Sequence, residues 1–137
     1  MSLNVSGKLG EAQFAANYFY DTLFNSEEGQ VVGLGYFKQR GFRKEIIDRF
    51  RLGYNPERGD QFFREATSKG YTTEMLEKAG LAKNRNGIYH DVDRGRVIFP
   101  IQGMTGRVLG FGARVLKTTE KAPKYINTPE NELYIKS

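Results

Sequence analysis

The residues best suited to chemistry in this chain are cations, and they gather toward its C-terminal end. Residues 94–137 carry 8 Lys and Arg against 3 Glu, whereas residues 1–93 carry 13 charges of each sign. The whole formal charge of +5 therefore belongs to one region. Lysine and arginine bind phosphate groups, so this distribution indicates a scaffold that presents one face to a polyanion.

Arg114 is the first candidate for such a contact. In an extended run over residues 107–116, alternation places Gly110, Gly112 and Arg114 on the same face of the strand. The two glycines would leave a shallow backbone surface, over which a sugar-phosphate chain could lie while Arg114 binds a phosphate. The alternative is that the glycines bend the strand or admit a neighbouring element. The opposite, buried face would consist of Leu109, Phe111, Ala113 and Val115.

A second group of candidates lies between two prolines at residues 123–130. Here Lys124 could hold a phosphate, Tyr125 could stack on a base, and Asn127 could hydrogen-bond sugar or phosphate. The structural alternative is an edge segment whose tyrosine packs in the core. We interpret the scattered cations Arg107, Lys117 and Lys121 as a solvated face.

Acidic residues and histidine offer weaker signals. Asp91 and Asp93 have a spacing that divalent metal ions use, but no other histidine or carboxylate motif supports a metal site. We interpret them as a solvated loop and His90 as a partly exposed hairpin residue. The absence of cysteine excludes disulfides, a thiolate zinc site and a cysteine nucleophile, and it fits a reducing, cytoplasmic setting. The sequence contains no apolar run of the roughly 18–20 residues that a membrane span needs.

Helical spacing dominates the first two thirds of the chain, and extended runs follow. The order predicts an α+β fold, with N-terminal helices followed by a small antiparallel β-sheet. The predicted helices cover residues 10–24, 30–40, 43–50, 60–69 and 72–79, and the predicted strands cover 96–101, 107–116 and 124–127. Asn86-Gly87 predicts a tight hairpin. Pro100 predicts that the first of these strands is an edge strand or that the proline lies at a bulge.

Two helices carry more detailed expectations. The helix over 43–50 should turn four apolar side chains to the core: Phe42, Ile46, Ile47 and Phe50. Asp60 and Thr72 are the expected N-caps of the helices that follow. The length predicts one domain over residues 1–137. The opening Met-Ser-Leu is typical of an expression leader. Since nothing terminates the pattern at Lys136-Ser137, we expect an excised domain.

Four blocks of sequence resemble the N-terminal subdomain of the catalytic core of bacterial DNA primase, the DnaG family. They are residues 36–42 (YFKQRGF) with 46–54 (IIDRFRLGY), 96–101 (RVIFPI), 106–114 (GRVLGFGAR), and 123–130 (PKYINTPE) followed by Lys136. The blocks stand in the family's order and extend over residues 31–137. The chain departs from the family's usual pattern at two positions, with Ala113 in place of a glycine and Thr128 in place of a serine. Neither change prevents the backbone from lining a groove.

The resemblance implies an enzyme, a nucleotidyltransferase that makes short RNA primers on a single-stranded DNA template. This domain would form one wall of the groove beside a Toprim domain, whose acids hold Mg²⁺ or Mn²⁺, and a separate module would bind Zn²⁺. The expected partners are template DNA, RNA primer and NTPs, with a replicative helicase implied by the family only. We expect this fragment alone to be inactive and to have no catalytic or metal-binding residue of its own. The residues implied in nucleic-acid or nucleotide contact are Arg40, Arg114, Lys124, Tyr125, Asn127 and Lys136, with Arg96 as a further candidate.

Two alternatives remain open from the sequence. The basic face could dock an acidic protein partner, as a non-catalytic module. The chain could also belong to a primase-like protein of a phage or mobile element.

Overall fold

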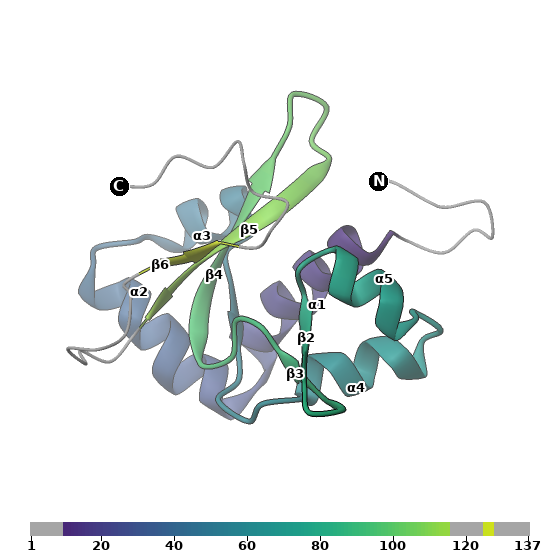
Figure 1. Ribbon diagram of the computed structural model, residues 1–137. Coiled ribbons are helices and arrows are strands. Elements are labelled where there is room, and N and C mark those ends of the chain that lie inside the picture. Colours follow the sequence, from purple (N-terminus) through teal and green to yellow (C-terminus); the bar gives the residue numbers. More distant parts are fainter. Residues whose placement is uncertain (1–9, 116–124, 128–137) are drawn as a thin grey trace.

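The computed structural model describes residues 10–115 and the backbone of residues 125–127. The helices are α1 (Glu11–Asn25), the π-helix η1 (Gly29–Leu34), α2 (Gly35–Gln39), α3 (Lys44–Phe50), α4 (Gln61–Ser68) and α5 (Thr73–Lys78). The strands are β1 (Gly53–Asn55), β2 (Ala82–Arg85), β3 (Ile88–Asp91), β4 (Arg96–Gln102), β5 (Val108–Val115) and β6 (Tyr125–Asn127). In Figure 1, α1 passes behind the sheet, with α2 and α3 on one side of the molecule and α4 and α5 on the other.

The strands form two antiparallel sheets, which confirms the predicted α+β fold. The larger sheet has the order β1-β4-β5-β6, and β2 pairs only with β3. The predicted hairpin is present, because Asn86 and Gly87 connect β2 to β3 with φ angles of 55° and 84°. Two consecutive positive φ angles are the signature of a type I′ turn, which suits the twist of the paired strands.

Strand β1 is missing from the sequence-based prediction. It has only three residues, but it pairs with Arg96 to Ile98 of β4 and makes β4 an inner strand there. Pro100 lies past the end of this pairing, where β5 alone is the partner of β4 among the described residues. The expected edge strand is therefore present in the half of β4 that contains Pro100. The expectation is wrong for the half from Arg96 to Ile98, which lies between β1 and β5.

A bulge in β5 changes which side chains are buried. Ile101 pairs with Gly110 and Gln102 pairs with Val108, so Leu109 is an extra residue on its strand. Beyond a bulge the alternation of faces shifts by one residue. Val108 is consequently 7% exposed and packs in the core, whereas Leu109 is 38% exposed. The prediction that Leu109 shares a buried face with Phe111 and Ala113 is wrong.

The core consists of two aromatic-rich clusters. One joins α1, α4, α5 and the sheet around Phe19, Phe62 and Phe111. The other joins η1, α2, α3 and the sheet around Phe37, Tyr54 and Val97. The Phe37 ring lies 5.2 Å from that of Phe42 and 5.9 Å from that of Phe99, so the second cluster fixes α2 against β4.

Helix α3 is less buried than its sequence predicts. Ile47 is 4% exposed and Phe42 packs against the second cluster, but Ile46 and Phe50 are 38% and 51% exposed. With seven residues, α3 has room to bury only one turn of its apolar side. The expectation is therefore right for Phe42 and Ile47 and wrong for Ile46 and Phe50. None of the helices formed by the described residues combines the length and the apolar character needed to cross a lipid bilayer.

Candidate nucleic-acid interface

Arg40 and Arg114 converge on one aromatic ring, that of Tyr36. The guanidinium carbon of Arg40 lies 4.9 Å from the ring centre and that of Arg114 lies 5.9 Å from it. Arg40 is the C-cap of α2, and Arg114 lies near the end of β5. Two guanidinium groups from residues 74 positions apart in the chain therefore meet at one ring. We call Arg40, Arg114 and Tyr36 the arginine pair site.

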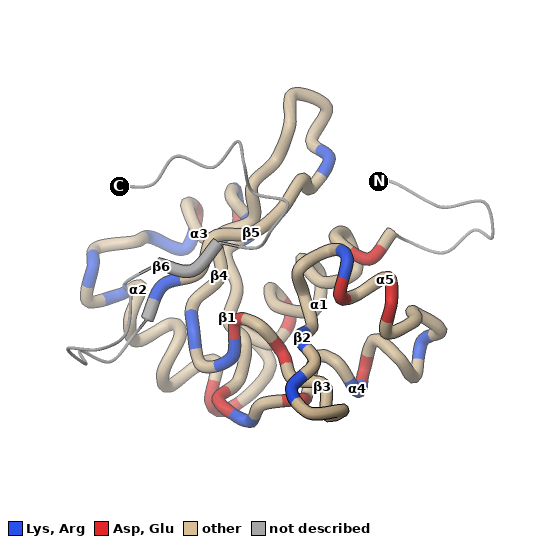
Figure 2. Tube along the Cα trace, in the orientation of Figure 1, with Lys and Arg blue, Asp and Glu red and all other residues tan. Residues whose placement is uncertain are grey.

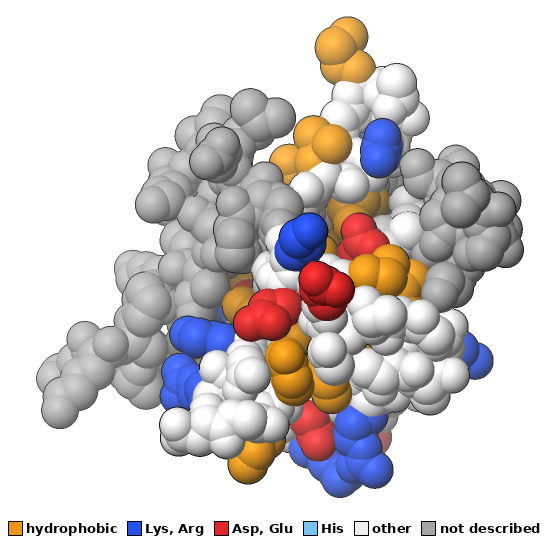
Figure 3. Space-filling view, turned by 45° about the vertical axis from the view of Figure 1, so that its right-hand side comes forward, with side chains coloured by type: hydrophobic (Ala, Val, Ile, Leu, Met, Phe, Trp, Pro, Cys, Tyr) orange, Lys and Arg blue, Asp and Glu red, His pale blue; other side chains and the backbone are white. Residues whose placement is uncertain are grey.

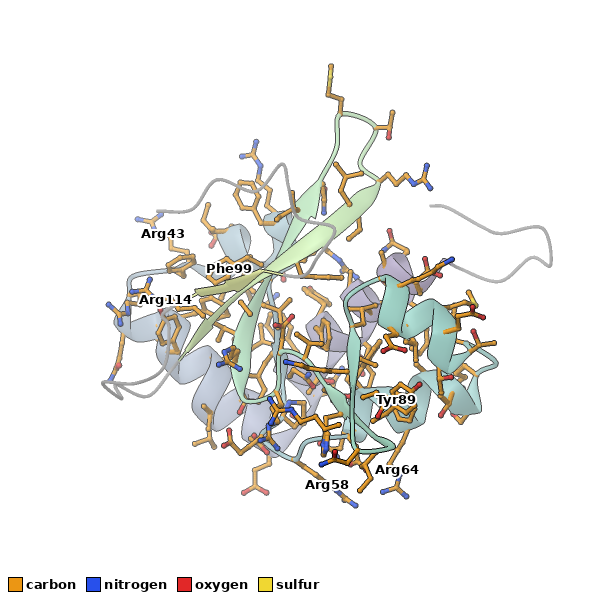
Figure 4. All side chains as sticks on the ribbon, viewed as in Figure 1. Arg43, Arg58, Arg64, Tyr89, Phe99 and Arg114 are labelled. Atoms are coloured by element: carbon orange, nitrogen blue, oxygen red, sulfur yellow. The ribbon has the colours of Figure 1, made fainter. Side chains whose placement is uncertain are left out.

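Additional cations surround this site. Arg43 is the N-cap residue of α3, and in Figure 4 it lies on the same side of the molecule as Arg114 and Phe99. Figure 2 shows basic residues along the connection from α2 to α3. Sequence reasoning did not select Arg43, because a lone arginine before a helix has no distinctive pattern.

Strand β6 brings two more predicted residues to the same part of the sheet. Tyr125 pairs with Arg114 and Asn127 pairs with Gly112 in the antiparallel register. Their backbones thus lie one strand away from Arg114, as a shared groove wall requires. The side chains of Tyr125 and Asn127 lie outside the described part of the structure, as do Lys124 and Lys136, so their roles remain predictions.

The bare glycine surface is not exposed in this structure. Gly110 and Gly112 are both buried, and they pair across the sheet with Ile101 and Phe99 of β4. Their burial favours the alternative, in which the glycines admit neighbouring groups. Arg114, which lies on the same strand, is partly exposed.

Arg96 is not brought to the arginine pair site. Its neighbour Val97 pairs with Arg114, so Arg96 lies on the opposite face of β4. The guanidinium group donates to the backbone oxygen of Arg94 at 3.3 Å, and burial lowers its pKa below the ordinary arginine value. A phosphate contact by Arg96 stays a prediction, and it would belong to a different surface.

A second basic surface lies at the β2–β3 hairpin. Arg85, His90 and Arg94 line a small cavity of about 130 Å³, which we call the hairpin pocket. In Figure 4, Arg58, Arg64 and Tyr89 lie in the same lower part of the molecule. Tyr89 stacks on Phe63 with ring centres 5.2 Å apart and planes only 5° from parallel. Cations next to a stacked aromatic pair suit an unpaired strand, whose phosphates and bases need both.

Sequence reasoning missed this second surface for a specific reason. Within residues 1–93 the charges cancel, which hides any local excess of one sign. Folding removes two of the acids from the surface, because Asp91 and Asp93 are only 4% and 3% exposed. Arg85 and Arg94 stay exposed at the surface, so charge that cancels along the chain separates in space.

The burial of Asp91 and Asp93 overturns their interpretation as a solvated loop. Asp91 accepts hydrogen bonds from the backbone N–H groups of Phe62 at 3.0 Å and Phe63 at 2.8 Å, at the start of α4. Desolvation raises its pKa to about 6, although these hydrogen bonds act in the opposite direction. Desolvation also raises the pKa of Asp93 to about 7, against the attraction of Arg96.

These two acids do not fit a divalent metal ion. Both carboxylate oxygens of Asp91 are occupied by backbone donors, and Asp93 lies beside the cationic Arg96. In the described ranges no group of three or more potential ligands gathers in one place. The Mg²⁺ or Mn²⁺ implied by the family resemblance therefore has no binding site among the described residues.

A larger cavity, of about 420 Å³, lies between the first turn of α1, the end of α5 and the start of β5. Its lining includes Glu11, Lys78, Arg107 and several apolar side chains. Figure 3 shows acidic, basic and hydrophobic side chains interspersed on this face of the molecule. Arg40, Arg96 and Arg114 do not line this cavity, so we do not assign it to the interface.

The relationship to known proteins agrees with this geometry. A family model described as "DNA primase catalytic core, N-terminal domain" matches residues 18–137. The chain belongs to this family. DNA primases of Clostridium acetobutylicum and Legionella pneumophila are each 38% identical to it, over 89% and 99% of the chain. Because these matches cover only 20% and 22% of the relatives, the chain spans about a fifth of a curated primase.

Solved primase structures share the fold. The RNA polymerase domain of the Mycobacterium tuberculosis primase DnaG is 32% identical with a TM-score of 0.79, covering 90% of this chain and 40% of that one. A DnaG primase catalytic domain bound to ssDNA is 30% identical with a TM-score of 0.78, covering 90% and 39%. A structure of the zinc-binding and RNA polymerase domains of the Aquifex aeolicus primase, at 24% identity and a TM-score of 0.74, shows the fold alone, covering 98% and 33%.

Proposed function

We propose that this chain forms the nucleic-acid-binding wall of a bacterial DNA primase, the enzyme that makes short RNA primers on single-stranded DNA. The observation that carries the proposal is the convergence of Arg40 and Arg114 on Tyr36, next to strand β6. Guanidinium groups bind phosphate oxygens in a bidentate manner. Two of them on one surface therefore suit the backbone of a template or primer, or the phosphates of an incoming nucleotide.

The primase relatives support the choice of nucleic acid over an acidic protein partner. One structural neighbour is described as bound to ssDNA, and another as a complex with double-stranded DNA that has a 6-nucleotide overhang. Transferred to this chain, such a strand would contact the arginine pair site, with Lys124, Tyr125, Asn127 and Lys136 as further contacts. The curated relatives are bacterial DNA primases, which does not favour the docking-module and mobile-element alternatives.

The hairpin pocket extends this proposal. Two arginines and a histidine line this pocket, and the stacked Tyr89–Phe63 pair belongs to the same surface. Together they offer a second place for an unpaired strand. A template that contacts both surfaces would be held at two points. Longer oligonucleotides should then bind more tightly than short ones that reach only one surface.

Primer synthesis itself requires groups that this domain does not supply. Nucleotide joining needs carboxylates that hold Mg²⁺ or Mn²⁺, which activate the attacking hydroxyl and neutralise the leaving pyrophosphate. The family resemblance assigns them to the Toprim domain and assigns Zn²⁺ to a separate module, in a cytoplasmic enzyme that works with a replicative helicase. We therefore propose that the 137-residue chain binds nucleic acid but does not join nucleotides. Template-dependent dinucleotide synthesis by the purified chain would contradict this.

The binding role is tested by the salt dependence of single-stranded DNA binding, measured by fluorescence anisotropy. Each phosphate contact releases counterions and contributes about 0.7 to the slope of log K against log salt for a single strand. The double variant R114A/K124A should therefore lower this slope by about 1.4. K69A, at the far end of α4, is the control and should leave the slope unchanged.

Two results would count against the proposal. An unchanged slope in R114A/K124A would remove both residues from the contact list. If short single-stranded DNA caused no NMR chemical-shift changes at low salt, the docking-module alternative would be favoured over nucleic-acid binding.

A further inference from the structure

The side chain of Tyr36 occupies an unusual position, because it is the common neighbour of the two arginines of the proposed interface. Arg40 lies four residues after Tyr36, on the same side of one helical turn, and Arg114 arrives from β5. Both guanidinium groups lie within the roughly 6 Å at which an aromatic ring attracts a cation. One ring therefore interacts with cations that come from two different elements.

This arrangement has an electrostatic consequence. Two guanidinium groups that both approach one ring carry like charges, which repel each other when no anion is bound. The negative face of an aromatic ring offsets part of this repulsion. Tyr36 can thus keep both arginines at one place on the surface before a phosphate backbone arrives.

The ring is well suited to this task because it is held rigidly. Tyr36 is only 9% exposed and packs edge-to-face on Phe37, with ring centres 5.7 Å apart. Phe37 in turn packs on Phe99 of β4. The ring is therefore attached to the sheet that carries Arg114 as well as to the helix that precedes Arg40.

The hydroxyl group of Tyr36 adds a second observation. It is buried and has no hydrogen-bond partner among the described residues. Buried tyrosine hydroxyls usually find a partner, since an unpaired one is costly. A phenylalanine would offer the same ring face without this cost, so exchanging Tyr36 for phenylalanine separates the role of the ring from that of the hydroxyl.

We propose that Tyr36 is a positioning residue, whose ring holds Arg40 and Arg114 together as one preorganised phosphate-binding unit. The proposal rests on the nucleic-acid role proposed above and specifies how that surface is prepared. Tyr36 acts through the arginines and does not itself contact the nucleic acid. Preorganisation raises affinity because the cost of ordering the two side chains is met before binding.

The test combines binding and NMR measurements on the 137-residue chain with Y36F, Y36L and the arginine double variant R40Q/R114Q. Y36F keeps the ring and should bind single-stranded DNA within about twofold of the unaltered protein. Y36L removes the ring at similar volume and should bind about fivefold to tenfold more weakly. In the R40Q/R114Q background, Y36L should cause no further loss, since the groups through which the ring acts are gone.

A control separates positioning from general damage. Y71L removes a buried tyrosine from the other core cluster, and it should lower the unfolding midpoint without changing DNA affinity. NMR provides a readout without DNA, because ring currents from Tyr36 shift the Nε–H signals of Arg40 and Arg114. These shifts should persist in Y36F and disappear in Y36L.

The possible outcomes distinguish this proposal from the one on which it rests. If R40Q/R114Q binds DNA as well as the unaltered protein, the proposed interface fails and the role of Tyr36 fails with it. If R40Q/R114Q weakens binding but Y36L does not, or if Y36L costs as much in both backgrounds, the interface stands and the positioning role is wrong. An equal loss in Y36F and Y36L would assign the effect to the hydroxyl and also overturn the proposal.

Discussion

At the scale of single residues, one carboxylate organises the start of a helix that lies far from it in sequence. Asp60 directly precedes α4 and is the expected N-cap, but its side chain makes no capping hydrogen bond. Asp91 of β3 takes this role by accepting from the N–H groups of Phe62 and Phe63. By contrast, Thr72 caps α5 as predicted, accepting from the N–H of Met75 at 3.1 Å.

We therefore expect D91A to destabilise the protein by about 1–2 kcal/mol at pH 7, the usual cost of a lost helix cap. The substitution leaves two helix donors without their acceptor, and relief from burying the carboxylate offsets only part of that loss. Urea unfolding followed by circular dichroism measures the change. D60A is the matched control and should cost less than about 0.5 kcal/mol, because Asp60 makes only an exposed ion pair with Arg58 at 3.6 Å. Equal losses in D91A and D60A would show that the cap assignment is wrong.

At the scale of elements, the connection from α1 to α2 shows why a glycine-containing segment can still be helical. The sequence predicts one helix over residues 30–40, weakened by its glycines, and the structure has the π-helix η1 followed by α2. A Cβ atom at Gly29 would lie 2.1 Å from the backbone oxygen of Thr22 in α1. Gly29 therefore permits η1 to approach α1, and this approach positions α2 with its Tyr36.

Two glycine-to-alanine variants should consequently change stability in opposite directions. G29A forces η1 away from α1 and should cost about 2–3 kcal/mol. A Cβ atom at Gly35 would meet no atom within 4 Å, and its φ and ψ of −58° and −44° are ordinary for a helix. G35A should therefore stabilise the protein by about 0.5–1 kcal/mol by restricting the unfolded chain. Thermal and urea unfolding of both variants check this, and a G29A variant as stable as the unaltered protein would contradict the proposed role of contact at Gly29.

At the scale of the whole molecule, folding redistributes the charge that the sequence contains. The formal value of +5 counts every acid as ionised. Burial raises the pKa of Asp93 to about 7, so part of the population is neutral at this position near neutral pH. The folded protein is therefore more positive than its formal charge, which favours association with a polyanion.

The same burial predicts how stability depends on pH. The pKa of Asp93 rises from 3.8 to about 7 on folding, so between these values the folded state holds a proton that the unfolded state has released. Stability should therefore increase as the pH falls from about 7 toward 4, and Asp91, with a pKa of about 6, acts in the same direction.

The variant D93N removes this contribution because an amide does not titrate. It should be more stable than the unaltered protein at pH 8, and this advantage should shrink as the pH approaches 4. Comparing the two proteins at each pH cancels the effects of other carboxyls, such as Asp48, whose pKa is lowered by its hydrogen bond from Lys44. Urea unfolding across this pH range provides the measurement, and a difference that does not change with pH would show that Asp93 is not a buried titrating group.

The sequence by itself determined the features that depend on neighbouring residues. Apolar spacing was sufficient to predict α1, and the Asn86–Gly87 pair was sufficient to predict the hairpin. The residue type of Thr72 predicted its role as an N-cap, and the sequence blocks around Arg40 and Arg114 indicated the family. Only the tertiary structure decided the features that depend on distant contacts. The bulge at Leu109, the strand β1 and the separation of Arg96 from Arg114 follow from how β4 pairs. The burial of Asp91 follows from the contact between β3 and the start of α4. Packing of distant segments also brings Arg40 and Arg114 to one ring. The physical reason is that local sequence determines which helices and strands form, whereas burial of the apolar faces of these elements determines where they meet.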